Sequence, residues 1–190
     1  MYLCLEKKVG KKIPDMPRKK KPVSDSCITM TELVLPNDTN TLQNLMGGQL
    51  MHWMDVAAAI AAQKHSGRVV VTASVDNISF GYPIHLGNVI TLKAQVTRAF
   101  SSSMEVFIRV HAEDIPAGKK IESHSAFFTF VAVDQGGRPI DVPEAVPETK
   151  EEIELFDGAL RRRQLRLVLG GRMKPEDAKE LKSIFFLKDN

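Results

Sequence analysis

The chain has 190 residues, of which 43% are hydrophobic, 26% are charged and 6% are aromatic. This balance is typical of one globular domain with a peripheral extension. No apolar run approaches the ~18 residues that cross a bilayer, and the N-terminus lacks an apolar segment of the secretory type. We therefore expect neither a membrane span nor secretion.

The cysteines and histidines exclude two further classes of protein. Cys4 and Cys27 are too few for a disulfide scaffold or a paired-cysteine zinc site, which fits a reducing, cytoplasmic location. The five histidines lack the spacing of metal ligands, so no metal site is expected.

The net charge of +3 is unevenly distributed along the chain. Residues 1–22 contain eight Lys and Arg against Glu6 and Asp15, so the remainder is net negative. The basic run at 18–21 could contact nucleic acid or an anionic surface. We prefer to interpret residues 1–23 as a solvated, disordered leader, and we expect no nucleic-acid partner.

The compact domain is expected over residues 24–142 and begins with a strand near 28–35. The PNDTN cluster then favours a turn, because Asn and Asp side chains compete for backbone hydrogen bonds. The next segment is rich in Ala, Leu and Met and predicts a helix over 48–65, which Gly67 ends.

Three polar residues, Gln49, His52 and Asp55, recur every three positions within this otherwise apolar helix. A helix that is apolar on nearly all sides is typically enclosed by other elements. We therefore expect the rest of the domain to wrap around it.

Beyond the helix the apolar pattern changes to a period of two, which indicates β-strands. Four strands are expected in the segments 69–80, 88–100, 103–114 and 123–134, joined mainly by short turns. One strand, one buried helix and four long strands predict an α+β fold in which an antiparallel sheet curls around a central helix.

Residues 143–190 form a predicted helical extension. The segment 147–169 carries Glu early and Arg late, as the helix dipole favours, and a second helix is expected near Pro175. The apolar end at 184–187 needs a partner surface, either on its own domain or on a neighbouring subunit.

Asp55 is the anomalous residue of the central helix. A carboxylate removed from water without a partner costs several kcal/mol, so Asp55 lies either on a solvated edge or in a functional site. About two turns upstream, Gly47 and Gly48 open the helix. Their amides could stabilise an oxyanion, although a plain tight turn is the alternative.

Three segments resemble the hotdog-fold acyl-CoA thioesterases, in particular the short bacterial acyl-CoA hydrolases and the related brain-type enzyme. They are PNDTNTLQNLMGGQLMHWMD at 36–55, RVVVTASVDNISFGYPIHLGN at 68–88 and FFTFVAVDQGGRP at 127–139. The resemblance covers most of residues 28–141 and implies a long central helix wrapped by a curved antiparallel sheet. It does not extend to the C-terminal helices.

The resemblance implies that the chain hydrolyses acyl-CoA to free acid and coenzyme A. Asp55 matches the catalytic carboxylate, which acts either as a general base toward water or as the nucleophile. Asn44 matches a residue that positions the water or the thioester. Gly47 and Gly48 would supply the oxyanion hole.

Coenzyme A is part of the substrate, so no separate cofactor is expected. Its pantetheine arm would bond along the strand that contains Val70, Thr72 and Ser74. Arg68 is the first candidate for its phosphates. The further candidates are Arg98, Lys119 and the arginines at 161–163.

The resemblance also implies a homodimer in which Asn44 and Asp55 serve one site from two chains, and often a trimer of such dimers.

Two other functions stay open. A non-catalytic acyl-CoA-binding regulator would need a DNA-binding helix-turn-helix, for which the segment before Ile28 is too short and lysine-rich. A hydratase or dehydratase would need a paired Asp and His, and only His52 shares a helix face with Asp55.

Overall fold

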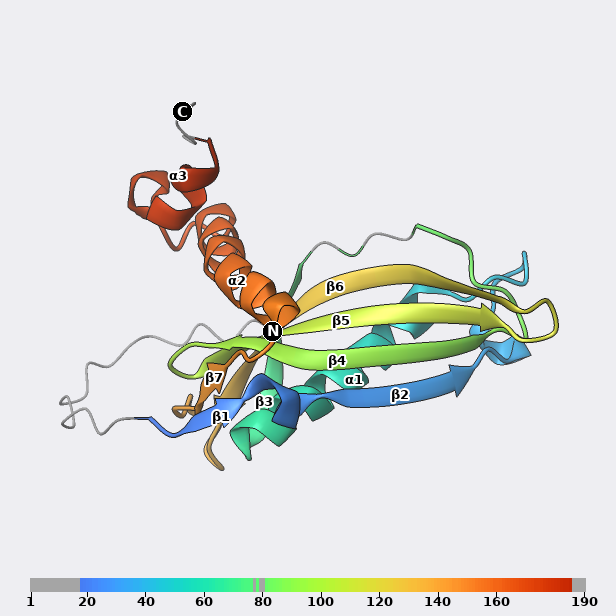
Figure 1. Ribbon diagram of the computed structural model, residues 1–190, viewed down its shortest axis with the longest axis horizontal. Helices are drawn as coiled ribbons and strands as arrows, with labels where there is room; N and C mark the ends of the chain where they lie inside the picture. The colour runs from blue at the N-terminus through green and yellow to red at the C-terminus, as the bar shows by residue number, and fades with distance from the viewer. Residues whose placement is uncertain (1–17, 77, 79–80, 186–190) are drawn as a thin grey trace.

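One long helix and one curved sheet form the centre of the molecule (Figure 1). The computed structural model describes residues 18–76, 78 and 81–185. The sheet is antiparallel, with its strands in the order β2-β4-β5-β6-β3. These elements are β2 (Ile28–Leu33), α1 (Gly47–Ser66), β3 (Val69–Asp76), β4 (Val89–Ala99), β5 (Ser103–Asp114) and β6 (Lys119–Val133).

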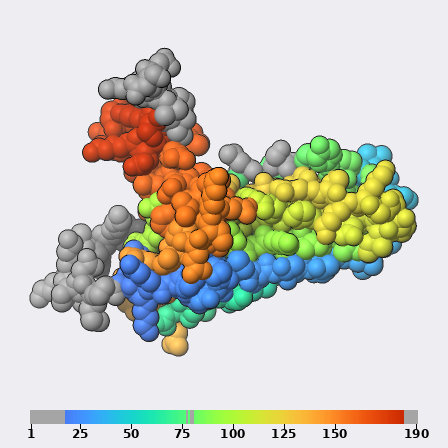
Figure 2. Space-filling view, viewed as in Figure 1, coloured from blue at the N-terminus to red at the C-terminus, as the bar shows by residue number. Residues whose placement is uncertain are grey.

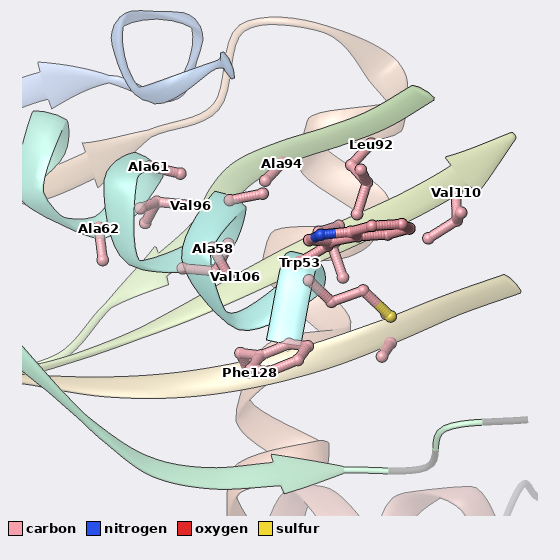
Figure 3. Packing of buried hydrophobic residues seen from close by; sticks show 14 of the residues in the cluster. Trp53, Ala58, Ala61, Ala62, Leu92, Ala94, Val96, Val106, Val110 and Phe128 are labelled. Atoms are coloured by element: carbon pink, nitrogen blue, oxygen red, sulfur yellow. The ribbon is translucent and has the colours of Figure 1, made fainter. Parts of the chain in front are cut away.

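This arrangement confirms the expected α+β hotdog fold. Helix α1 ends at Gly67, whose left-handed backbone (φ 64°) closes the helix as predicted. Its sheet-facing side is made of small residues, and Ala58, Ala61 and Ala62 are fully buried. Because alanine is short, the helix axis can approach the sheet, where Val96, Phe128 and other core side chains fill the space between them (Figure 3).

The sheet wraps α1 as expected, but in a single protomer the described residues leave part of the helix exposed. Met51 and Ile60 are 39% and 43% exposed, His52 is exposed, and Asp55 is half-buried. A five-stranded sheet covers only one side of the helix, so these residues form an open face of α1. The apolar pattern of α1 predicts that this face is covered, and residues 18–76, 78 and 81–185 of one protomer leave it open.

The domain also begins earlier than expected. Strand β1 (Lys20–Pro22) pairs in parallel with β7 (Glu144–Val146), and Arg18 bonds to the carbonyl of Phe100. The expected domain, residues 24–142, therefore leaves out both strands of this small sheet, which the prediction had divided between the leader and the C-terminal extension. The remainder of the basic leader, residues 1–17, lies outside the described residues.

Two helices follow the sheet, as predicted. Helix α2 (Lys150–Leu169) begins at Thr149, whose side chain accepts a hydrogen bond from the Glu152 amide, and it lies on the face of the sheet opposite α1 (Figures 1 and 2). Helix α3 (Lys179–Phe185) follows it, but the side chains of the apolar end at 184–187 lie outside the described part. Three short 3-10 helices complete the fold: η1 (Val23–Ser26), η2 (Pro36–Asp38) and η3 (Pro175–Asp177).

Over the described ranges, no helix is long and apolar enough to span a membrane.

Candidate active site

The carboxylate of Asp55 is held by the edge strand of the sheet. Thr72 Oγ1 on β3 donates a 2.8 Å hydrogen bond to Asp55 Oδ1. Thr72 pairs across the strands with Phe130, a core residue, and this places the threonine on the α1 side of the sheet. Thr72 was predicted to bind substrate along its strand, and in the structure its side-chain hydroxyl is bonded to Asp55.

The start of α1 presents free backbone donors. Met46 is the N-cap and provides no side-chain acceptor, and its carbonyl takes the amides of Gln49 and Leu50. Within the described ranges, the amides of Gly47 and Gly48 have no hydrogen-bond acceptor. Unsatisfied amides at a helix start carry partial positive charge, so this end can bind a negatively charged oxygen.

Gly48 is not required by packing inside the protomer. A Cβ atom added there would meet no other atom within 4 Å. The open space above this amide is therefore accessible to a ligand or a second chain.

A tight turn rich in asparagine leads into the helix. Asn40 Oδ1 accepts the amides of Leu42 at 2.9 Å and Asn44 at 3.2 Å, and Gln43 lies in the left-handed region at φ 58°. Asn44 Oδ1 is buried and has no hydrogen-bond partner among the described residues. A buried amide oxygen without a partner is uncommon, and it makes Asn44 available to a bound group.

A hollow of about 380 Å³ lies beside this turn and the start of α1. Its lining includes Asn44, Gly47, Leu50, Ile84 and His124, but not Asp55. Asp55 follows Gly47 by eight residues, or about 12 Å along the helix axis. Asn44 and Asp55 therefore do not face one common hollow in a single protomer.

His124 is a site residue that the sequence did not reveal. The histidines were interpreted as structural or solvated, yet the buried side chain of His124 lines the hollow. Burial lowers the pKa of the His124 imidazole, which favours its neutral form. Its place in a strand pattern indicated burial but not which cavity it would line.

The three residues expected to bind substrate on β3 do not share one face. The strand register shifts between Thr72 and Ser74, so that Ser74 pairs with Thr129 instead of continuing the alternation. Thr72 faces α1, whereas Ser74 faces the opposite side of the sheet. Val70 pairs with the buried Ala132 and packs against the core.

Arg68 lies at the other end of α1 and does not reach the first hollow. It lines a second hollow of about 540 Å³ together with Arg138, which pairs with Asp134 at 3.2 Å. Among the further phosphate candidates, Arg98 and Arg162 are occupied by packing. The guanidinium group of Arg98 stacks on Phe156 of α2, and that of Arg162, itself on α2, stacks on Phe127 of β6.

The pairing that a hydratase would need is not present in the described part of the chain. Asp55 bonds to Thr72, and no hydrogen bond or ion pair joins it to His52.

Comparison with known proteins identifies the class. The family model of the thioesterase superfamily matches residues 42–119. The acyl-CoA thioester hydrolase YkhA of Bacillus subtilis is 42% identical over 73% of this chain and 80% of its own length. Two mammalian proteins match a smaller part of their length: acyl-coenzyme A thioesterase 11 of mouse (40% identity, 77% of this chain, 25% of that protein) and the cytosolic acyl coenzyme A thioester hydrolase of rat (37%, 81% and 41%).

Solved structures agree with this relationship. An apo-hexameric acyl-CoA thioesterase has a TM-score of 0.76 and 38% identity over 78% of this chain and 95% of its own. The acyl-CoA hydrolase of Staphylococcus aureus, solved with butyryl coenzyme A and coenzyme A, has a TM-score of 0.74 and 36% identity over 80% of this chain and 95% of its own. The chain belongs to the hotdog-fold acyl-CoA thioesterases, a family of thioester hydrolases.

Proposed function

We propose that the protein hydrolyses acyl-CoA to a free acid and coenzyme A, with Asp55 as the general base. The observation that carries this proposal is the Thr72–Asp55 hydrogen bond on the open face of α1. It fixes one carboxylate oxygen and leaves the other available to a water molecule. Direct attack by Asp55 on the thioester, through an acyl anhydride, is the alternative first step.

In the base-catalysed step, Asp55 takes a proton from water as the water oxygen bonds to the thioester carbon. The carbonyl oxygen becomes an oxyanion, which the amides of Gly47 and Gly48 would stabilise. The intermediate then collapses and the carbon–sulfur bond breaks. Protonated Asp55 returns its proton to the leaving sulfur, so coenzyme A departs as the thiol and the carboxylate base is regenerated. Asn44 would hold the water or the thioester through its side-chain amide.

We propose that this site forms between two chains. In one protomer Asp55 lies about 12 Å along the helix axis from Gly47, and α1 has an open face. Strand β3 is an edge of the sheet and carries the exposed Val69 and Val71, so a second copy could add its own β3 there. The Asn44 turn of one chain would then meet Asp55 of the other, and three such dimers would give a hexamer.

The solved Staphylococcus aureus variants suggest a second asparagine for this site. Single Asp, Asn and Thr residues of that enzyme were each replaced by Ala, the Asn fifteen positions before the Asp and the Thr seventeen positions after it. Counted from Asp55, the same spacing falls on Asn40 and Thr72 in this chain. We propose that Asn40 and Asn44 together form the polar side of the site, and that Thr72 orients the base.

Coenzyme A would bind along the edge of the sheet, without a separate cofactor. Val70, Thr72 and Ser74 stay the proposed contacts of the pantetheine arm, through those backbone groups of β3 that the partner strand leaves unpaired. Arg68, beside the second hollow, is placed for the phosphates. The name of the cytosolic rat relative supports a cytoplasmic location.

The proposal is tested by initial rates of thiol release on a panel of acyl-CoA esters. The Asp55→Asn protein should lose about 10² to 10⁴ in turnover, because the base is removed while the size of the side chain is kept. Its thermal unfolding should match that of the unmodified protein, because Asp55 lies outside the core. A correctly folded Asp55→Asn protein with unchanged rates on every ester would exclude Asp55 as the base.

A further inference from the structure

Helix α2 crosses the outer face of the sheet one strand after another (Figure 1). Near its start, the ring of Phe156 stacks under Arg98 of β4 at 4.2 Å. In its middle, Arg162 pairs with the buried Glu105 of β5 at 2.7 Å. Near its end, Arg166 pairs with Asp76 of β3, the edge strand. Successive turns of α2 therefore lie over β4, β5 and β3.

The chain continues past this edge. We call Leu165–Phe185 the C-terminal arm; of its described residues, none beyond Arg166 hydrogen-bonds to the sheet. Leu169 is 79% exposed. Helix α3 is attached to α2, with the Leu181 amide donating to Gln164 Oε1 at 2.9 Å, and the arm stands clear of the sheet (Figure 2).

A groove with mostly apolar walls lies where the arm leaves the sheet. Its volume is about 500 Å³, and Val75 and Phe127 line it from the sheet while Leu165 and Leu169 line it from the arm. The rest of its lining consists of Asp76, Ser125, Arg162, Arg166 and Gly170. Val75 and Leu165 are themselves 36% and 39% exposed. The groove borders β3, which among the described strands pairs with β6 alone, so exposed apolar side chains and an unpaired strand edge occur together.

We propose that the C-terminal arm packs on the outer face of the partner subunit's sheet, across the seam between the two β3 strands. This inference rests on the proposed β3-paired dimer. A partner strand added at β3 continues the sheet in the same surface, and the arm already extends in that direction. Two-fold symmetry makes the contact reciprocal, so two arms clasp one dimer.

This reciprocal packing of the two arms, which we call the clasp, assigns a role to the C-terminal helices, which lie outside the three segments that resemble thioesterases in sequence. It covers Leu169 and closes the groove at β3, and so buries apolar surface that is exposed in one protomer. It acts on assembly and leaves the reacting groups untouched. Because the proposed active site is shared, a weaker dimer would lower activity only at protein concentrations where the subunits separate.

Cross-linking in mixed assemblies tests the clasp directly. A photoreactive amino acid replaces Leu169 in protein labelled with nitrogen-15, which is exchanged with unlabelled, unsubstituted protein and irradiated. We expect labelled arm peptides joined to unlabelled peptides from β3 or β6. Cross-links confined to labelled chains in a proven mixed dimer, or no cross-links, would overturn the clasp.

Two matched variants measure how much the arm contributes to the stability of the dimer. Leu169→Glu should raise the dimer dissociation constant at least tenfold in sedimentation equilibrium, with the rate per assembled site unchanged. Ile153→Glu, at a 46% exposed position near the start of α2, should leave the constant unaltered. A wild-type monomer would overturn the β3 dimer and with it the clasp, whereas an unaffected Leu169→Glu dimer would overturn the clasp alone.

Discussion

The Thr72 hydroxyl and the Asp55 carboxylate form the smallest functional unit of the molecule. Asp55 on a helix and Thr72 on an edge strand lie seventeen positions apart in the chain, and their 2.8 Å bond fixes the direction of the proposed base. A hydrogen bond to a carboxylate is stronger than one between neutral groups, so it can hold the side chain in one rotamer.

We predict that Thr72→Val lowers the turnover number about tenfold, because the base loses its orienting donor while the side-chain volume is kept. Thr72→Ser keeps the hydroxyl and should retain most of the activity. Steady-state rates on one acyl-CoA ester, with thermal unfolding as a check on folding, compare the two variants. Equal losses for Val and Ser would indicate a packing role for Thr72 rather than an orienting one.

For single residues, the sequence indicated which side chains are unusual but not which other residues they contact. The glycine pair at 47–48 predicted the start of the helix, which begins at Gly47, and Asp55 stood out among apolar neighbours, because local spacing shows both features. The Thr72 bond and the placement of His124 depend on strand register and curvature. The bulge after Thr72, which turns Ser74 to the other face, left no clear signal in the alternation of residues 69–76.

An ion pair with a fully buried carboxylate contributes to the attachment of α2 to the sheet. Glu105 is completely buried and receives hydrogen bonds from Thr97 and Arg162, and the Arg162 guanidinium also lies 3.8 Å from the ring centre of Phe127. A buried carboxylate without its cation is costly, whereas an apolar pair of similar volume is often tolerated.

Arg162→Met should therefore lower the free energy of unfolding by about 3 kcal/mol, because Glu105 is left buried without its cation. The double variant Glu105→Met/Arg162→Met should recover most of this loss. Denaturant titrations at one fixed protein concentration provide the comparison. If the double variant is as unstable as the sum of the two single variants, the pair is not the source of the effect.

The end of α1 contains a buried histidine that makes stability depend on pH. His65 is 1% exposed, and its Nε2 lies 3.1 Å from the carbonyl oxygen of Pro143. Its Nδ1 is buried without a partner in the described part of the chain. Burial lowers the pKa of His65, and the Pro143 carbonyl opposes this only in part. Protonation therefore favours the unfolded chain.

We predict that neutral His65 makes its full contribution to the free energy of unfolding above its ordinary pKa near 6.5. The free energy of unfolding should decrease as the pH falls below that value. The loss ends once the pH is below the folded-state pKa. His65→Gln should reduce this slope without abolishing it, because burial also lowers the pKa values of His111 and His124. Urea titrations between pH 7.5 and 5.5 measure it, and an unchanged slope in His65→Gln would contradict this assignment.

The sequence predicted individual helices and strands better than it predicted which strands pair with one another. Each strand of the main sheet and both helices of the extension were visible from period, capping residues and turn clusters. The parallel pair β1–β7 was missed, because three-residue strands far apart in the chain have no periodic signal. The same limit explains why residues 18–22 were assigned to a disordered leader.

For the whole molecule, the open face of α1 is the decisive feature. The sequence placed Asp55 in a helix that needs a complete apolar cover, and a single protomer leaves that helix uncovered along one side. The two observations agree if a second chain completes the enclosure. The claim on which the proposed mechanism depends is therefore that the two polar halves of one site come from different subunits.

Subunit complementation tests this claim most directly. Asn40→Ala/Asn44→Ala protein and Asp55→Ala protein, each inactive alone, are mixed under conditions where native mass spectrometry proves exchange. A shared site predicts recovery of about a quarter of the unmodified activity, since half of the dimers are mixed and each mixed dimer has one intact site. Proven exchange with activity still at background would contradict a shared site.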